Sequence, residues 1–145
     1  VSVLYWARPP INTRTHTLRI MSSAASRLSD VVTRQDVSSL ANHTEVAASH
    51  MDLAWHLDFA AERIGGTVVL RMATVVPGVT RIVLDAKGLN VAAVKVSVAD
   101  GPEEPATFGP ADDACEALGQ GLAIALPRAI ETAGTTVHVR VEYQT

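Results

Sequence analysis

The feature that most constrains the fold is a strict alternation of apolar and polar side chains that begins at Met51. The apolar positions are Met51, Leu53, Trp55, Leu57 and Phe59, and the polar positions between them include Asp52, His56 and Asp58. A period of two is the spacing of a β-strand with one buried face. The stretch therefore predicts a long strand that contributes one face to a core.

Further apolar stretches follow, and the connections between them carry Pro, Gly or acidic residues. The predicted strands lie at about residues 51–59, 64–74, 80–85, 91–99, 121–126 and 135–143. The last of them has a well-specified apolar row at Val137, Val139, Val141 and Tyr143. The expected fold is all-β, a sandwich-like or saddle-like arrangement of antiparallel or mixed sheets over residues 49–145.

Two turns are marked by glycine. Pro77-Gly78 predicts a type II turn, because proline presets φ and glycine accepts the positive φ that follows. Lys87-Gly88 predicts a second turn between Leu84 and Val91.

The first hairpin allows two turn placements. Gly65-Gly66 could form a two-residue turn with both residues at positive φ. Alternatively residues 60–63 turn the chain, and Gly66 lies inside the second strand as a bulge or tight bend. We favour the second placement, because it keeps Phe59 and Ile64 at the ends of two paired apolar rows.

The stretch from Asp100 to Gln120 is expected to be a solvated loop, with a short helix over Ala111–Leu118. Its carboxylates are Glu103, Glu104, Asp112, Asp113 and Glu116. These carboxylates lack the alternate spacing of a calcium-binding loop. Adjacent carboxylates on a loop also lack an enclosing pocket that would separate their pKa values, so acid–base catalysis is not expected. An exposed, charged surface is the simpler interpretation.

No residue qualifies as catalytic, cofactor-binding or metal-binding. The histidines are His16, His43, His50, His56 and His138, and no Glu follows any of them. His50 and His56 share a strand face, but strand rise places their Cα atoms roughly 20 Å apart, too far for one metal ion. Cys115 is the single cysteine, so it forms neither an internal disulfide nor a zinc–thiolate cluster, and we interpret it as a bystander thiol.

Composition excludes two classes of partner. A chain of 145 residues that is 48% hydrophobic fits one domain with a modest core. The formal net charge of −3, without a basic stripe interleaved with aromatic residues, gives no case for nucleic acid. No apolar run reaches the roughly 18–20 residues of a membrane helix, so no membrane partner is expected.

Residues 1–48 differ from the rest, and we expect a disordered or leader-like tail with a weak helical turn over Asp36–Leu40. No acidic residue precedes Asp30, and four arginines lie among Ser, Thr and Ala. This balance is typical of a mitochondrial or plastid transit peptide. The alternative, which we favour, is an ordinary start at Met21 preceded by leader sequence, and it implies a cytoplasmic location.

Four blocks of the chain, in order, resemble the amino-terminal domain of the zinc aminopeptidases that include leukotriene A(4) hydrolase and aminopeptidase B. The first two blocks are His50, Leu53, Leu57, Asp58 and Phe59, then Ile64, Gly66, Thr67, Val68 and Leu70. The third is Val83, Leu84, Asp85, Leu89, Val91 and Val94, and the last is Ile124, Leu126 and Pro127 with Tyr143 and Thr145. The likeness spans about His50 to Thr145.

The resemblance implies a structural role without chemistry of its own. In the family the catalytic zinc is bound on an H-E-x-x-H helix in a later domain, and a G-x-M-E-N loop holds the amino end of the peptide substrate; neither motif occurs here. The chain is then expected to be an incomplete first domain whose partner is the catalytic domain of the same polypeptide. Because the strands that complete the domain in the family are missing, an exposed apolar face and an open backbone edge are expected at the terminal strand. The alternative is a free-standing, non-catalytic β-sandwich interaction module.

Overall fold

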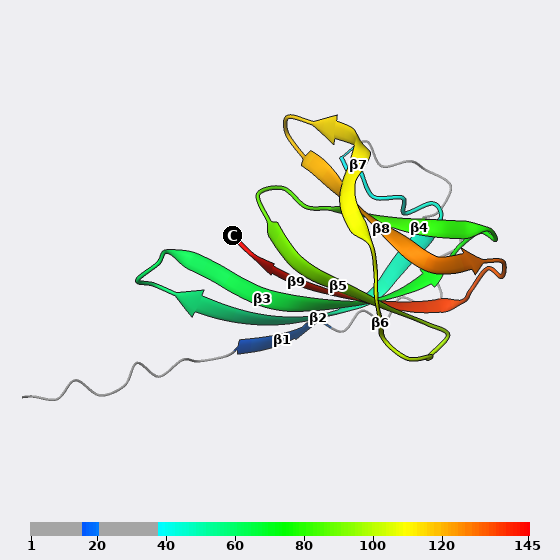
Figure 1. The fold of residues 1–145 in the computed structure, drawn as a ribbon, viewed down its shortest axis with the longest axis horizontal. Helices are drawn as coiled ribbons and strands as arrows, with labels where there is room; N and C mark the ends of the chain where they lie inside the picture. The colour runs from blue at the N-terminus through cyan, green and yellow to red at the C-terminus, as the bar shows by residue number, and fades with distance from the viewer. Residues whose placement is uncertain (1–15, 21–37) are drawn as a thin grey trace, which may run out of the picture.

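The computed structural model describes residues 16–20 and 38–145, and within them every regular element is a β-strand. The strands are β1 His16–Ile20, β2 Val46–Asp58, β3 Arg63–Thr74, β4 Val79–Asp85, β5 Asn90–Val98, β6 Glu104–Pro105, β7 Phe108–Cys115, β8 Gly119–Ile130 and β9 Thr136–Gln144. They form a larger sheet of order β1-β2-β3-β9-β5-β6 and a smaller sheet of order β4-β8-β7. All pairings are antiparallel, which confirms the all-β prediction (Figure 1).

The core lies between the inner faces of the two sheets. Ile82 of β4, Ile124 of β8 and Val137 and Val139 of β9 are fully inaccessible to solvent. The alternation predicted for the last strand is confirmed, since Val137, Val139 and Val141 are buried while the residues between them are less so. Strand periodicity therefore identified the β9 side chains of this core. The predicted row of β2 is not buried, since Met51, Trp55 and Leu57 are 36–40% exposed and Phe59 is 85% exposed.

The first hairpin turns between β2 and β3, which confirms the prediction that residues 60–63, rather than Gly65-Gly66, turn the chain. β2 ends at Asp58, β3 begins at Arg63, and Leu57 pairs with Ile64. The Asp58 side chain stabilises the turn, because its Oδ1 accepts hydrogen bonds from the backbone N–H groups of Ala60 and Ala61, each at 3.0 Å. Glycines at 78 and 88 have φ of +79° and +70°, as the two predicted turns require.

Gly66 forms no bulge, contrary to expectation. It pairs in regular register with Trp55 on β2 and Tyr143 on β9, and the irregularity in this pairing lies instead between Ala48 and His50. The reason for glycine is close approach: a Cβ at residue 66 would lie 2.5 Å from the carbonyl oxygen of Ala54.

The prediction of a loop and short helix between Asp100 and Gln120 is wrong. β6 and β7 lie there, and β7 pairs with β8 with a register shift between Pro110 and Ala114. Asp112 and Asp113 lie in this irregular part of β7, where their side chains are exposed. β7 is an edge strand, so Pro110, which has no backbone N–H to donate, is tolerated there. Gly119, at φ +79°, then allows the chain to return into β8.

The expected open edge at the terminal strand is also wrong. β9 lies inside the larger sheet, hydrogen-bonded to β3 on one side and to β5 on the other. Its core-facing side chains at 137, 139 and 141 are covered by the smaller sheet. The apolar surface that does remain uncovered belongs to the far end of the β2–β3 hairpin.

The β domain extends further toward the amino terminus than residue 49. Val46 begins β2 and is buried, and the preceding segment is fixed by Asp85, which accepts hydrogen bonds from Ser39 Oγ at 2.7 Å and the Leu40 N–H at 2.8 Å. Within the expected tail, His16–Ile20 forms β1 against β2. Residues 1–15 and 21–37, with most of the predicted tail and the start of its helical turn, lie outside the described residues.

One buried polar side chain closes the end of the sandwich opposite the β2–β3 turn. Thr74 is 2% exposed, and its hydroxyl donates to the carbonyl of Thr132 at 2.9 Å and accepts from the N–H of Thr135 at 3.0 Å. The side chain thus bonds two backbone groups of the β8–β9 connection, and the Thr132 carbonyl also accepts from Thr135 Oγ1 at 2.8 Å.

Candidate functional site

Three of the described histidines contact different partners in different parts of the fold. His50 Nε2 lies 3.3 Å from Asp52 Oδ2 on β2, and His138 Nδ1 on β9 lies 3.9 Å from Asp100 Oδ1. His43 binds the carbonyl of Ala41 through Nδ1 at 3.2 Å. Over residues 38–145, no three His, Cys, Asp or Glu side chains converge as a metal site would require, so the described donors do not fit a zinc ion.

The ionisable groups at the surface form pairs rather than an active centre. The closest is Arg140 on β9, whose guanidinium binds Glu103 with Nη2–Oε1 and Nε–Oε1 distances of 3.0 Å. The hydrogen bond from Arg140 lowers the pKa of Glu103 below its ordinary value of 4.5. Both side chains are more than a third exposed, so this pair is a surface contact with modest energy.

Cys115 is exposed at the end of β7. Hydrogen bonds from the backbone of Leu118 and then Ala117 lower the pKa of its thiol, with a smaller contribution from Lys87. Lys87 itself is held by the carbonyls of Glu116 and Ala117 at 3.0 and 2.8 Å. The groups that lower this pKa are backbone N–H groups and a lysine, none of which is a general base.

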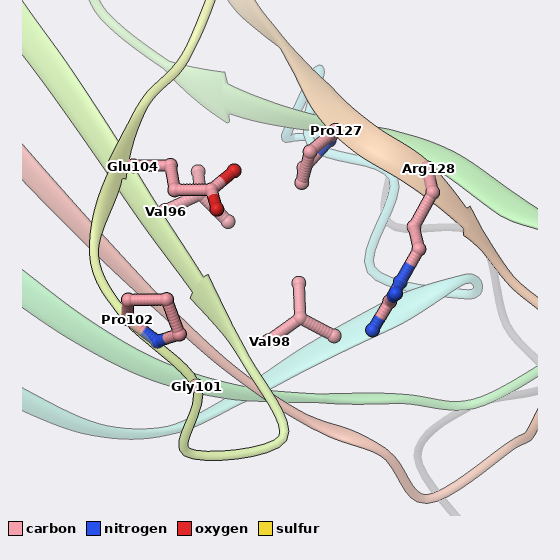
Figure 2. Close-up of a pocket in the computed structure, with 7 residues that line it drawn as sticks. All are labelled: Val96, Val98, Gly101, Pro102, Glu104, Pro127 and Arg128. Atoms are coloured by element: carbon pink, nitrogen blue, oxygen red, sulfur yellow. The ribbon is translucent and has the colours of Figure 1, made fainter.

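A polar-rimmed pocket of about 380 Å³ lies between the end of β5 and β8. Figure 2 shows its lining residues: Val96, Val98, Gly101, Pro102, Glu104, Pro127 and Arg128. The Glu104 carboxylate points into the pocket, while Arg128 extends along the opposite side (Figure 2). One carboxylate and one guanidinium above an apolar floor provide a single candidate base, Glu104, without a second titratable group to act as its acid.

One wall of this pocket is a strained turn. Ala99 and Asp100 both have positive φ, of 52° and 58°, and the N–H of Gly101 donates to the carbonyl of Val98 at 3.0 Å. Two central residues at positive φ make a type I′ turn, which favours Asn or Gly over Ala. The sequence analysis missed this turn because neither central residue is glycine or asparagine.

A second hollow, the inter-sheet groove, is apolar and also about 380 Å³ in volume. The larger sheet contributes Met51, Leu53, Val68 and Tyr143 to its lining, and Leu84 and Leu89 lie across from them. The lining is mainly aliphatic, but it also includes His43, which hydrogen-bonds the Ala41 carbonyl, and Asp85, which accepts from Ser39 Oγ and the Leu40 N–H. The groove is a place for packing rather than for chemistry.

The groove continues onto the end of the β2–β3 hairpin. Trp55 and Tyr143 meet there across Gly66, and the indole N–H donates to the Tyr143 hydroxyl at 2.8 Å. A side chain at residue 66 would displace the indole, because its Cβ would lie 2.9 Å from Trp55 Cδ1. The sequence analysis placed Trp55 on the core face but did not foresee this aromatic pair, because Tyr143 is 88 residues away.

No helix of the described residues is long and apolar enough to span a membrane.

Comparison with known proteins identifies relatives. No protein-family model matches the chain. It is 31% identical over 113 residues to leucine aminopeptidase 2 of Phaeosphaeria nodorum, a match that covers 78% of this chain and 17% of that protein. The chain thus spans about a sixth of the length of this curated relative.

The fold also matches solved structures. Leukotriene A4 hydrolase from Saccharomyces cerevisiae is 24% identical, with a TM-score of 0.61 over 77% of this chain and 17% of that one. Yeast leukotriene A4 hydrolase in complex with bestatin is 24% identical, with a TM-score of 0.62 over 78% of this chain and 16% of that one. At this level of identity the likeness concerns the fold.

Proposed function

We propose that this chain, which belongs to the zinc aminopeptidase family as part of its amino-terminal β domain, is a structural part of an enzyme that hydrolyses amino-terminal residues from peptides. The observation that carries the proposal is the 31% identity to leucine aminopeptidase 2 over 78% of this chain. The match covers only 17% of that protein, so most of such an enzyme lies outside the residues considered. The catalytic domain of the same polypeptide is the proposed partner, and peptides are the proposed substrates of the whole protein.

The residues that carry the family resemblance have structural roles in this fold, which supports a scaffold function. Asp58 holds the hairpin turn, and Gly66 permits the close approach of β2. Tyr143 binds Trp55, and Thr145 Oγ1 accepts a hydrogen bond from the Ile64 N–H at 3.1 Å. A motif made of turn, close-contact and strand-end residues serves the stability of a domain rather than catalysis.

Zinc belongs, in this proposal, to the rest of the enzyme. A catalytic zinc activates a bound water and polarises the scissile carbonyl. The described residues of this chain provide no ligand set for it, so the proposal places the metal ligands elsewhere in the enzyme. Its contribution is to pack beside the catalytic domain and to help limit which peptide ends reach the metal.

A second candidate is a free-standing β-sandwich interaction module. The specific observation in its favour is the core itself, in which Ile82, Ile124, Val137 and Val139 are fully buried without help from any further segment. The coding sequence after the Thr145 codon separates the two proposals. If it encodes G-x-M-E-N and H-E-x-x-H, the aminopeptidase proposal stands, and a stop codon there would favour the module.

We also propose a cytoplasmic location. The alternative is a mitochondrion or plastid, with the Arg- and Ser-rich amino-terminal segment as transit peptide. Fractionation of the source cells, with sequencing of the amino terminus of the mature protein, tests this. A mature protein that begins well after Met21 and co-purifies with an organelle would support the alternative.

A further inference from the structure

Two opposite charges face each other across the pocket between β5 and β8. Glu104 reaches it from β6 of the larger sheet and Arg128 from β8 of the smaller sheet (Figure 2). Neither side chain has an ion-pair partner among the described residues, so the two groups do not pair with each other. Both charges are therefore available to a ligand that lies between them.

The lining between the two charges is apolar. Val96 and Val98 of β5 and Pro127 of β8 provide it, and Val96 is 2% exposed and so belongs to the fixed core. The hollow of about 380 Å³ lies within the range of about 300–1,000 Å³ that small-molecule sites occupy. A ligand with an aliphatic middle would lose apolar surface to this lining and gain free energy of binding.

One wall of the pocket is ordered in advance. The turn at Ala99 and Asp100, with both residues at positive φ, is held from two sides. The Ser97 hydroxyl donates to the Gly101 carbonyl at 2.6 Å, and the Ala99 N–H donates to the Thr136 carbonyl at 2.8 Å. Strained backbone persists only where its surroundings hold it, and such strain is concentrated at ligand sites. A wall that is already ordered also lowers the entropy cost of binding.

We propose that this pocket binds a small zwitterion with an aliphatic body, whose ammonium group lies at Glu104 and whose carboxylate lies at Arg128. An ammonium group donates charge-assisted hydrogen bonds to a carboxylate, and a guanidinium binds a carboxylate through two parallel N–H groups. A free aliphatic amino acid and a short peptide with free ends share this chemistry and differ in the separation of their charges. The inference does not depend on the proposed function, because it is built only from the residues that line the pocket.

The competing explanation is that Glu104 only guards the edge of the larger sheet. β6 is the last strand of that sheet, and an inward-pointing charge on an edge strand discourages pairing with another chain. An edge guard needs neither a positive partner across a pocket nor an apolar lining. The two explanations predict different results when the charges of a ligand are removed.

Ligand titrations followed by two-dimensional ¹⁵N–¹H NMR test the proposal on the 145-residue chain. The probes are L-leucine and leucyl-leucine, each compared with its N-acetyl form and its C-terminal amide. We expect the free probes to shift the amide signals of lining residues such as Val98 and Gly101. Blocking either end should weaken binding by about tenfold, which corresponds to one charge-assisted contact of about 1.4 kcal/mol. The free probe that binds more tightly identifies whether the site takes an amino acid or a peptide. No shift at the lining residues, or equal binding of free and blocked forms, would overturn the inference.

Charge variants provide a second test with matched controls. Glu104→Gln and Arg128→Gln should each weaken binding of the free probe by about tenfold. Glu62→Gln and Arg63→Gln remove the same charges where β2 turns into β3, away from the pocket lining, and should leave binding unchanged. Circular dichroism checks that each variant is folded, and the comparison of free and blocked probes needs no variant. A Glu104→Gln variant that aggregates but binds the free probe as tightly as the parent would show that Glu104 is an edge guard and overturn the inference.

Discussion

Replacing Gly66 by alanine is expected to destabilise the fold, whereas the same change at its neighbour Gly65 is not. A Cβ at residue 66 would lie 2.5 Å from the Ala54 carbonyl oxygen and 2.9 Å from Trp55 Cδ1. At residue 65 the nearest atom, the Tyr143 carbonyl oxygen, is 3.9 Å away, which is an ordinary contact. Both glycines lie in β3 and neither has a positive φ, so the pair isolates the steric effect.

The expected difference follows from three contributions to the free energy of unfolding. Overpacking costs about 1–3 kcal/mol, and here the nearer atom belongs to backbone that cannot rotate away. Loss of the hydrogen bond between the Trp55 indole and Tyr143 costs about 0.5–1 kcal/mol more. This is the lower end of the range for a hydrogen bond, because Trp55 is 36% exposed. Alanine itself is favoured over glycine in a strand by about 0.5–1 kcal/mol, a gain that both variants share.

Gly66→Ala should therefore be about 1–3 kcal/mol less stable than the parent, and Gly65→Ala equal to it or up to about 1 kcal/mol more stable. Urea denaturation followed by circular dichroism measures both. With a slope of about 1–3 kcal/mol per molar urea, the midpoints of the two variants should differ by roughly 1 M. Equal midpoints, or a more stable Gly66→Ala, would refute the close-approach explanation.

Three further changes follow from the same structure. Ala99→Asn should stabilise the fold by about 0.5–1 kcal/mol, because Asn tolerates the positive φ that Ala99 adopts. Urea denaturation measures this, and a loss of stability would contradict the turn assignment. Thr74→Val should cost about 1–3 kcal/mol, since the Thr135 N–H loses its acceptor and the Thr132 carbonyl keeps only the Thr135 hydroxyl. Thr74→Ser should restore most of this loss, and equal losses from Val and Ser would show that the hydroxyl is not the cause. Arg140 lowers the pKa of Glu103, so the pair stabilises the fold above the ordinary value of 4.5 and that contribution is lost as pH falls through the lower folded value. Glu103→Gln should thus cost about 0.2–1 kcal/mol at pH 7 and nothing in acid, and a cost independent of pH would argue against the ion pair.

Local pattern was sufficient to predict six of the nine described strands, the hairpin turn and the β9 part of the core. The period-two row of β9 placed its apolar side chains in the core, whereas the row of β2 stays largely exposed, and glycines marked the turns at 78 and 88. These features depend on residues close together in the sequence, so the sequence alone is enough to predict them.

The remainder depended on pairing between distant segments. β7 carries Pro110, Asp112 and Asp113, residue types that are rare in strands, and only its place at the edge beside β8 makes them tolerable. The position of β9 between β3 and β5 is a property of sheet order that no local pattern contains. For the same reason the contact between Trp55 and Tyr143 was not predictable.

The most direct test of the central claim is a parallel measurement of zinc content and aminopeptidase activity on two proteins. One is the 145-residue chain, and the other is the polypeptide made from the complete coding sequence. We expect the longer protein to hold about one zinc per molecule and to release amino-terminal residues from peptides, and the 145-residue chain to do neither. One tightly bound zinc in the 145-residue chain, or a longer polypeptide with neither zinc nor activity, would contradict the claim that this chain is the structural part of a zinc aminopeptidase.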